Sequence, residues 1–365
     1  MSEFFKKIGS IIMAIIMFFM NLFGLGAKPE DDKIKNVIFL IGDGMGVMSI
    51  EKTRSETGAA LALDSFPVKS LSKTASANSS VTDSAAGATA LACGVRTNNG
   101  AVGVYPDDMN AEKNYPMNLC EFAKANGMKA GIVTTDSTRG ATPGGFSAHT
   151  SSRNNTSEIT KYQLESELDL IWGVKTSTCS KSKAESAGFE YVTDYNEMAA
   201  LSEGTRSFGQ FTGSLWKNDC KNMPTLTQMT EKAIDLLDGG ENGFFLMIEG
   251  AHIDKNSHSN NGEGMKEALI SFDRAVNAAL DYAKKDGHTL VVVTADHETG
   301  GITLENGEYV YTTGGHTGVD VPLYVYGCDN FIAEGESSVL NTDIPKRIVA
   351  ALEKDGFPCS VSVAA

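Results

Sequence analysis

Four continuous apolar runs stand out along the chain, and polar or glycine-rich residues follow each of them. The runs are NVIFLIG at residues 36–42, KAGIVTT at 129–135, GFFLMI at 243–248 and TLVVVTA at 289–295. A strand that helices cover on both faces of a parallel sheet has this pattern, because neither face meets water. We therefore predict that the four runs are strands of a parallel sheet.

Helical patterns separate the predicted strands. Small residues at 85–93 favour a short helix, and further strands are predicted at 189–193 and near 323–326, with a hairpin near Asn306 and Gly307. The alternation of strands with helices predicts an α/β fold. Other helices are expected at 118–126, 224–237, 265–284 and 344–354.

The chain has 365 residues, which is long enough to bury a large core. Between residues 154 and 242 the pattern loosens into short helices and a stretch rich in Ser, Thr and Lys. We expect residues 1–27 to be a leader and residues 28–365 to be a single domain, in which residues 154–242 form an inserted, lid-like region.

The leader has the composition of a secretory signal peptide. Lys6 and Lys7 precede an apolar run at 11–23, and small residues follow at 24–27. We therefore expect export to the periplasm or the extracellular space. In the alternative interpretation, residues 8–27 remain as a membrane anchor, because the apolar run is close to the length that spans a bilayer. Stable membrane association is expected only in that case.

Export would place the six cysteines in an oxidising compartment, where some of them could form disulfides. Cys179 and Cys220 flank one irregular segment, and they are the pair that we expect. Cys93 lies in the predicted helix of small residues and is expected to be a buried thiol.

Acidic residues outnumber basic residues by 46 to 31, and the formal net charge is -15. Such a surface repels nucleic acid, so we expect no nucleic-acid binding. An anionic substrate would need local positive charge at its binding site. Bound metal ions are the natural source of that charge.

Acidic and imidazole side chains follow three of the predicted strands. Asp43 follows the first run, Glu249 the third, and Asp296 with His297 the fourth. The carboxyl ends of parallel strands lie at one edge of a sheet, where ligands commonly bind. Each aspartate alone could simply cap a loop, but several carboxylates at one edge would repel one another unless cations lay among them. The pattern therefore indicates a metal centre.

A first ligand set combines one carboxylate with two imidazoles. Asp254 and His258 are four residues apart and would share one face of a helix, and His316 comes from a separate glycine-lined loop. Carboxylate and imidazole ligands together are typical of zinc.

A second ion could be reached by Asp296 and His297 together with Asp43. A further, oxygen-only set consists of Asp43, Glu249 and the hydroxyl of Thr142. Oxygen ligands alone suit magnesium better than zinc.

The segment TDSAAGATALAC at residues 82–93 places a hydroxyl beside a carboxylate at the start of a predicted helix. Thr82 or Asp83 can cap that helix, and its positive end favours an anion beside Ser84. Ser84 is therefore a candidate nucleophile for phosphate chemistry. The alternative is that the segment is only a helix cap, which is the commoner use of such residues.

Five motifs, in this order, resemble those of the alkaline phosphatase family: GDGMG, TDSAAGATA, EGAHIDKNSH, TADHET and GGHTG. The resemblance extends from Asn36 to Tyr326 and is weaker across residues 154–242. It implies a three-layer αβα sandwich around a central, mostly parallel sheet. It also implies a metal-dependent hydrolase of small phosphate monoesters that tolerates many leaving groups, forms a phosphoserine on Ser84 and assembles as a homodimer.

The resemblance further implies a role for each matching residue. Two zinc ions and one magnesium ion would be bound, and Ser84, Arg153 and Lys255 would be catalytic. Asp83, Arg153 and Lys255 would contact the substrate, with the Arg153 guanidinium holding the phosphoryl oxygens. The metal ligands would be Asp254, His258 and His316 for one zinc, Asp43, Asp296 and His297 for the other, and Asp43, Thr142 and Glu249 for magnesium.

One position departs from the family pattern. Before the Ala-Thr-Pro turn, well-known bacterial relatives carry an acidic residue and animal relatives a histidine, where this chain has Gly140. We expect magnesium binding to depend on this position and predict that Gly140→Asp tightens it. Lys255 is then expected to lack its usual carboxylate partner, and either to lie closer to the substrate or to be a solvated side chain.

Three other functions can be compared with monoester hydrolysis. A sulfatase would carry Cys or Ser followed closely by Pro and Arg, whereas two alanines follow Ser84. Diesterase and pyrophosphatase relatives commonly use Thr as the nucleophile, and Arg153 would occupy the space of a second ester group. An exported metal-binding or phosphate-binding protein without turnover would lack the nucleophile or a ligand, and none is missing. We therefore expect monoester hydrolysis.

Overall fold

The helices and strands of the protein are those of a computed structural model that describes residues 33–109, 114–217 and 222–353. The unit that begins at Ile34 contains all of these elements. The strands are β1 (Asn36–Ile41), β2 (Val68–Lys73), β3 (Lys129–Ser137), β4 (Leu170–Val174), β5 (Glu190–Val192), β6 (Ser207–Phe211), β7 (Phe244–Glu249), β8 (Thr289–Thr294), β9 (Glu298–Thr299), β10 (Ile302–Glu305), β11 (Glu308–Tyr311), β12 (His316–Thr317), β13 (Val321–Tyr326) and β14 (Ser338–Leu340). The helices are α2 (Val47–Thr57), the short 3-10 helix η2 (Ala62–Ser65), α3 (Ser84–Cys93), α4 (Leu119–Ala125), α5 (Ala141–Gly145), α6 (Thr156–Glu165), α7 (Lys181–Ser186), α8 (Tyr195–Ala199), α9 (Leu226–Leu237), α10 (His252–His258), α11 (Gly262–Asp286) and α12 (Asp343–Ala351).

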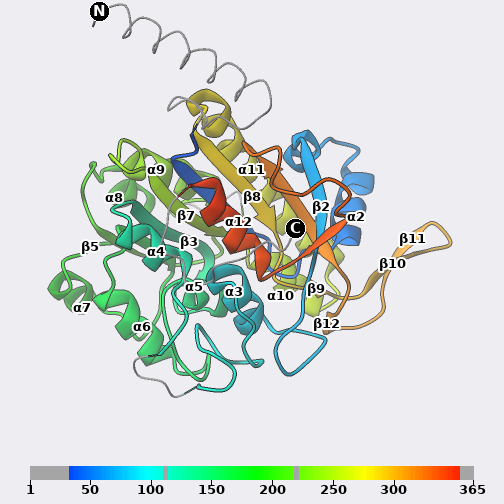
Figure 1. The fold of residues 1–365 in the computed structure, drawn as a ribbon, viewed down its shortest axis with the longest axis horizontal. Helices are drawn as coiled ribbons and strands as arrows, with labels where there is room; N and C mark the ends of the chain where they lie inside the picture. The colour runs from blue at the N-terminus through cyan, green and yellow to red at the C-terminus, as the bar shows by residue number, and fades with distance from the viewer. Residues whose placement is uncertain (1–32, 110–113, 218–221, 354–365) are drawn as a thin grey trace, which may run out of the picture. The chain divides into compact units, whose positions relative to one another are not determined.

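Ten of the strands form one sheet in the order β14-β2-β13-β8-β1-β7-β3-β4-β6-β5 (Figure 1). Strand β13 pairs antiparallel with β2 and β8, and the other neighbours in the sheet are parallel. The four apolar runs form β1, β3, β7 and β8, which are consecutive in the order β8-β1-β7-β3. Their prediction as strands of a parallel sheet is therefore confirmed.

Alternate side chains of β1 enter two separate hydrophobic cores. Ile38 and Leu40 pack in the core that includes residues of α9 and α11. Val37, Phe39 and Ile41 pack in the second core, with residues of α3, α4 and α12. Because side chains of a strand point alternately to the two faces of the sheet, helices cover both faces. The predicted three-layer αβα sandwich around a mostly parallel sheet is confirmed.

The predicted helices and the predicted hairpin lie within a few residues of those in the structure. The helix predicted from residue 224 begins at Leu226, because Thr225 caps it: the Thr225 hydroxyl accepts from the Gln228 amide at 3.2 Å, and the Gln228 side chain accepts from the Thr225 amide at 2.9 Å. The predicted hairpin joins β10 and β11, with positive φ angles of 51° at Asn306 and 88° at Gly307.

Residues 154–242 extend the central sheet. Their described part contributes β4, β6 and β5 to one end of the sheet, and α9 packs against β3 and β7. This arrangement differs from the expected lid-like insertion. The strand predicted at 189–193 is confirmed as β5. Strands β4 and β6 were not predicted because they are short and contain glycine, although all five residues of β6 are buried.

The leader (residues 1–27) and Cys220 lie outside the described residues. Cys179 is buried and is not in a disulfide among the described residues, and burial raises the pKa of its thiol to about 11. Cys93 is buried in α3, as expected. Within residues 33–109, 114–217 and 222–353, no helix combines the length and the apolar character that crossing a membrane requires.

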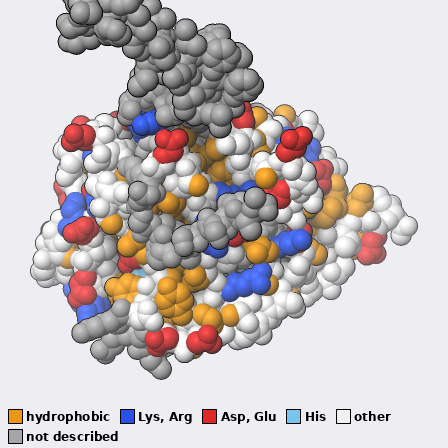
Figure 2. Space-filling view, in the orientation of Figure 1, with side chains coloured by type: hydrophobic (Ala, Val, Ile, Leu, Met, Phe, Trp, Pro, Cys, Tyr) orange, Lys and Arg blue, Asp and Glu red, His pale blue; other side chains and the backbone are white. Residues whose placement is uncertain are grey.

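Hydrophobic side chains lie among charged and other residues on the face shown in Figure 2. Acidic and basic side chains are interspersed over its described part, so that the net negative charge is not gathered into one patch there. The hairpin of β10 and β11 projects from the body and exposes Leu304 and Val310, by 54% and 38%.

Candidate active site

Side chains from three strand ends meet at the carboxyl edge of the sheet. Strand β1 lies between β7 and β8, so Asp43, Glu249 and the pair Asp296 and His297 are brought to one place. All four side chains are buried, with exposed fractions of 7% or less. The parallel topology therefore brings these strand ends together, as expected from the sequence.

The GDGMG loop lets the backbone after β1 pass against the site. Gly44 has a φ of 70°, and a Cβ atom there would lie 2.8 Å from both Asp254 Cα and Thr299 Oγ1. Its amide donates to Asp296 Oδ1 at 3.2 Å. Only glycine satisfies both the positive φ and the close approach, and the loop thereby fixes Asp43 beside Asp296.

Helix α3 begins at Ser84 and is capped by the residue before it. Asp83 Oδ1 accepts from the Ala86 amide at 3.0 Å. Of the two predicted caps, Thr82 and Asp83, the structure therefore uses Asp83. The cap places Ser84, which is 4% exposed, in the first turn of the helix.

Small side chains allow α3 to approach the end of β8. A Cβ atom on Gly87 would lie 2.9 Å from the Asp296 carbonyl oxygen. This close packing brings Ser84 Oγ to 3.1 Å from His297 Nε2. The candidate nucleophile therefore faces the candidate metal ligands.

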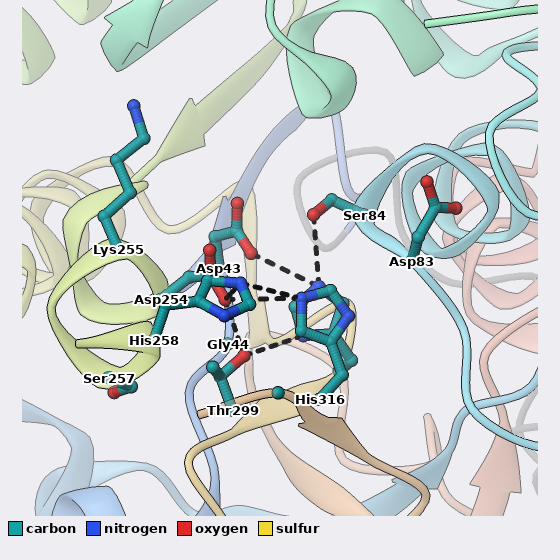
Figure 3. Close-up of polar contacts among 12 residues, drawn as sticks. Asp43, Gly44, Asp83, Ser84, Asp254, Lys255, Ser257, His258, Thr299 and His316 are labelled. Atoms are coloured by element: carbon teal, nitrogen blue, oxygen red, sulfur yellow. Dashed lines mark hydrogen bonds and ion pairs between the residues drawn. The ribbon is translucent and has the colours of Figure 1, made fainter. Parts of the chain in front are cut away.

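Asp254, His258 and His316 form a tight group in Figure 3. The Nε2 atoms of the two histidines are 3.1 Å apart, and they lie 3.3 Å and 3.6 Å from Asp254 Oδ1. Their Nδ1 atoms face the carbonyl oxygens of Gly314 and Thr82, at 2.7 Å and 2.9 Å. Each Nδ1 therefore donates, which leaves a lone pair on each Nε2 of the neutral rings.

Two lone pairs and a carboxylate that face one another repel unless a cation lies among them. Tetrahedral zinc with bonds of about 2.0 to 2.1 Å separates its ligand atoms by about 3.3 Å. The distances within the group of Asp254, His258 and His316 are close to this value. The group therefore fits zinc.

A second group surrounds His297. Its Nε2 atom lies 3.3 Å from Asp296 Oδ2 and 3.5 Å from Asp43 Oδ1. Both carboxylate oxygens are buried and have no hydrogen-bond partner among the described residues. Thr299 donates to Asp254 Oδ1 at 2.5 Å and lies 3.2 Å from His297 Nδ1. This group also fits zinc, and Asp254 lies close enough to both groups to border the second one.

The electrostatics of these groups agree with a site for cations. Burial, followed by the charge of Asp296, raises the pKa of Asp43 well above its usual value. Burial and the charge of Asp254 do the same for Asp296. Burial and the charge of His316 lower the pKa of His297, which keeps the imidazole in its neutral, metal-binding form.

Glu249 and Thr142 form an oxygen-only corner of the site. Glu249 accepts a hydrogen bond from Thr134, and burial raises the pKa of Glu249 to about 7. Thr142, in the short helix α5, lies close enough to stabilise the charged carboxylate, although its hydroxyl makes no hydrogen bond of normal geometry with the described residues. This donor set fits magnesium.

Arg153 contacts Asp83, the residue that precedes Ser84. Its Nη1 atom is 3.1 Å from Asp83 Oδ2, and its charge acts on Asp43 and His297. Asp83 thus caps α3 with one oxygen and holds the guanidinium with the other. The side chain of Arg153 is 38% exposed, so an anion can reach it from solvent.

Lys255 has a carboxylate partner, contrary to the expectation from the sequence. Its Nζ atom lies 2.5 Å from Asp136 Oδ1. Figure 3 shows Lys255 on α10, on the opposite side of Asp43 from Ser84. The expectation failed because it considered only position 140, whereas the partner comes from the end of β3.

Comparison with known proteins decides the family. A family model described as alkaline phosphatase matches residues 34–171 and 176–314. The chain belongs to the alkaline phosphatase family. It is an enzyme, a phosphomonoesterase, and the resemblance of its five motifs is confirmed.

Curated members of the alkaline phosphatase family align with most of the chain. Alkaline phosphatase 3 of Bacillus subtilis (strain 168) is 30% identical over 97% of this chain and 98% of its own length. The alkaline phosphatase of Escherichia coli (strain K12) is 34% identical over 73% of this chain and 71% of its own.

A solved alkaline phosphatase shares the fold. The enzyme from the Antarctic bacterium TAB5 is 32% identical, with a TM-score of 0.78 over 89% of this chain and all of its own. A variant of the TAB5 enzyme, with Mg bound in its M3 site, matches with a TM-score of 0.76.

Several residues of the phosphatase site were missed from the sequence. Thr299 lies within the TADHET motif, which could have indicated it, because its hydroxyl bridges Asp254 and His297. Thr134 lies at the end of the apolar run at 129–135 and Asp136 directly follows it, and this position was the available signal.

Proposed function

We propose that the protein hydrolyses phosphate monoesters through a phosphoserine on Ser84, with two zinc ions and one magnesium ion bound. The observation that carries the proposal is the position of Ser84 Oγ, 3.1 Å from His297 Nε2 at the start of a helix. Neutral imidazoles and buried carboxylates surround this hydroxyl, and they are the donor types that bind zinc.

The types of donor atom assign each metal ion to one set of residues. When bound, the ions supply positive charge that favours the ionised hydroxyl and the charge developing on phosphate oxygens. One zinc is proposed at Asp254, His258 and His316, the other at Asp43, Asp296 and His297, and magnesium at Asp43, Thr142 and Glu249.

Ser84 would carry out the covalent steps. Its Oγ attacks phosphorus, and the ester oxygen leaves with the electrons of the broken P–O bond. Water then attacks the phosphoserine and releases inorganic phosphate, which regenerates Ser84. The start of α3 adds a positive field at the point where the phosphoryl group is held.

Arg153 and Lys255 would supply fixed positive charge. Arg153 has five N–H donors, and the contact of Nη1 with Asp83 leaves others to bind phosphoryl oxygens. The Lys255 ammonium, beside Asp136, would act on the substrate through its charge. All of these groups would interact with the phosphate, and none of them with the alcohol part of the substrate. We therefore propose that the enzyme tolerates many leaving groups.

The test is hydrolysis of p-nitrophenyl phosphate by wild type, Ser84→Ala and Ser80→Ala. Ser80 is exposed and four residues away, and its variant is the matched control. We expect Ser84→Ala and EDTA treatment each to abolish turnover, and zinc with magnesium to restore the EDTA-treated wild type. Full activity of Ser84→Ala would contradict the proposal. Faster hydrolysis of bis-p-nitrophenyl phosphate than of the monoester would replace it with a diesterase.

We also propose that the protein is exported and acts as a homodimer. Support for export is the composition of residues 1–27, and support for the dimer is the family resemblance. Cell fractionation of the full chain should place activity outside the cytoplasm, and light scattering of the purified enzyme should give twice the chain mass. Activity in the cytoplasm alone, or a monomer at assay concentration, would reject the respective proposal.

A further inference from the structure

The end of β3 contacts the last residue of β7 and the segment that follows it. Thr134 donates to the Glu249 carboxylate, Thr135 Oγ1 accepts from the Ala251 amide at 3.0 Å, and Asp136 pairs with Lys255 at 2.5 Å. Three consecutive side chains of β3 thus contact three of the seven residues from Glu249 to Lys255. This arrangement links the proposed magnesium ligand Glu249 to the proposed phosphate contact Lys255.

An irregularity of β3 makes this arrangement possible. Val133 pairs with Trp172 of β4, but the next pair is Ser137 with Val174, so that four steps along β3 oppose two along β4. The bulge packs directly on the glycine between them: a Cβ atom on Gly173 would lie 2.6 Å from the Asp136 carbonyl oxygen. Bulges re-aim side chains and are common beside active sites.

Asp136 occupies the space beside Gly140. A Cβ atom on Gly140 would lie 3.5 Å from Asp136 Oδ2. A Cβ atom at position 140 would therefore be in van der Waals contact with the Asp136 carboxylate. Gly140 supplies no carboxylate of its own, and the partner of Lys255 comes from the end of β3 instead.

The charged groups of the pair remain accessible to solvent. The two side chains are only partly buried, with exposed fractions of 31% for Asp136 and 43% for Lys255. The ammonium can therefore interact with an anion that enters from solvent, and its carboxylate partner offsets part of that attraction.

We propose that Asp136 is a positioning residue that holds the Lys255 ammonium at the end of β3 and thereby limits how tightly the enzyme retains phosphate. The inference rests on the proposed function. Moderate retention matters for a hydrolase that releases phosphate, because a product that binds tightly inhibits the next turnover.

The test compares Asp136→Asn with wild type at saturating zinc and magnesium. We expect the inhibition constant of inorganic phosphate to fall by about three- to tenfold, because one negative charge beside the ammonium is lost. Damage to the fold would weaken phosphate binding instead. Asp329→Asn, which removes a charge from an exposed residue, is the control and should leave the constant unchanged.

Three further variants identify the cause. In Asp136→Asn with Lys255→Met, the tightening should disappear, since the ammonium that produces it is gone. In Asp136→Asn with Gly140→Asp, a carboxylate returns from the neighbouring position, so the constant should return toward the wild-type value. Asp136→Glu keeps the charge and should behave like wild type.

An unchanged or raised inhibition constant in Asp136→Asn would overturn the inference, as would tightening that persists without Lys255. Isothermal titration of inorganic phosphate into the metal-loaded protein gives a readout that does not depend on turnover. If wild type fails to hydrolyse monoesters, the proposed function fails, whereas a wild type that hydrolyses them with no change in Asp136→Asn rejects only the role of Asp136.

Discussion

Two sides of the candidate site balance their charges differently. They are the histidine side (Asp43, Asp254, His258, Asp296, His297 and His316) and the β3 side (Thr134, Asp136, Thr142, Glu249 and Lys255). On the histidine side, Nε2 atoms and carboxylates face one another at 3.1 to 3.6 Å, and no Lys or Arg of the described residues forms an ion pair with them. On the β3 side, an ammonium and a carboxylate lie 2.5 Å apart.

The difference indicates what each side requires. The histidine side brings together groups that repel or leave lone pairs unsatisfied, so it depends on bound cations for its stability as well as its chemistry. The β3 side already contains a cation of its own. Changes on the histidine side should therefore abolish activity, and changes on the β3 side should only adjust it.

The largest effect is expected from loss of a histidine ligand. His258→Ala and His316→Ala should each lower kcat/KM by about 1000-fold, because a bound metal supplies several kcal/mol of charge stabilisation. His288→Ala, at the amino end of β8, is the matched control and should retain activity. Zinc per chain, measured by mass spectrometry, should fall only in the first two variants. Full zinc content with full activity in either one would remove that histidine from the site.

After chelation of bound metal ions, the free energy of unfolding should fall as pH rises. Burial raises the pKa of Glu249 from 4.5 to about 7. A raised carboxyl pKa in the folded state stabilises the protein at low pH, and this contribution is lost as pH rises through the folded value. EDTA-treated protein should therefore lose stability between pH 4.5 and about 7.

Thermal unfolding checks this dependence. The melting temperature of the EDTA-treated protein should fall by roughly 5 °C or more across that interval, since Glu249 and the buried aspartates contribute together. Added zinc and magnesium should remove the decrease, because cations replace the protons. A chelated protein that becomes more stable over the same interval would contradict the charge repulsion deduced for the site.

A smaller effect is expected from substitutions of Asp83, which pairs with Arg153. Asp83→Asn keeps a good helix cap but loses the ion pair, so KM for p-nitrophenyl phosphate should rise by about three- to tenfold at an unchanged melting temperature. Asp83→Ala should raise KM similarly and also cost about 1 kcal/mol of stability through the lost cap. Equal KM values for wild type and both variants would show that the Asp83 contact does not position Arg153.

The smallest effect is expected on the β3 side. Gly140→Asp adds a carboxylate beside Asp136, and it should tighten magnesium binding by about two- to threefold. Gly140→Asn is the matched control, since it adds the same volume without charge. Magnesium titrations of activity that coincide for the two variants and wild type would refute the effect.

The parts of the site that follow from strand ends could be predicted from the sequence. A buried apolar run that ends in Asp43, Glu249 or Asp296 gives both the strand and the edge at which its last residue lies, because parallel strands point the same way. A helix cap at Thr82 or Asp83 also follows from local sequence, and the structure shows that Asp83 is the cap. These features depend on short stretches of chain and on one topological rule.

Features that depend on contacts between strands could not be predicted. The pairing of Asp136 with Lys255 requires a bulge in β3 that packs on Gly173 of β4, and nothing in the apolar run at 129–135 indicates its register. Strands β4 and β6 were missed because their own sequences are weak signals. Strand β4 (LIWGV) is apolar but has only five residues and includes a glycine, and β6 (SFGQF) is buried although it contains polar residues and a glycine.

Anomalous scattering at the zinc absorption edge, measured on crystals of active enzyme, tests the central claim most directly. Two peaks are predicted, one among Asp254, His258 and His316 and the other among Asp43, Asp296 and His297, with Ser84 Oγ facing the second. Crystals of fully active enzyme that show no zinc peak at either group would contradict the claim that cations hold these side chains together.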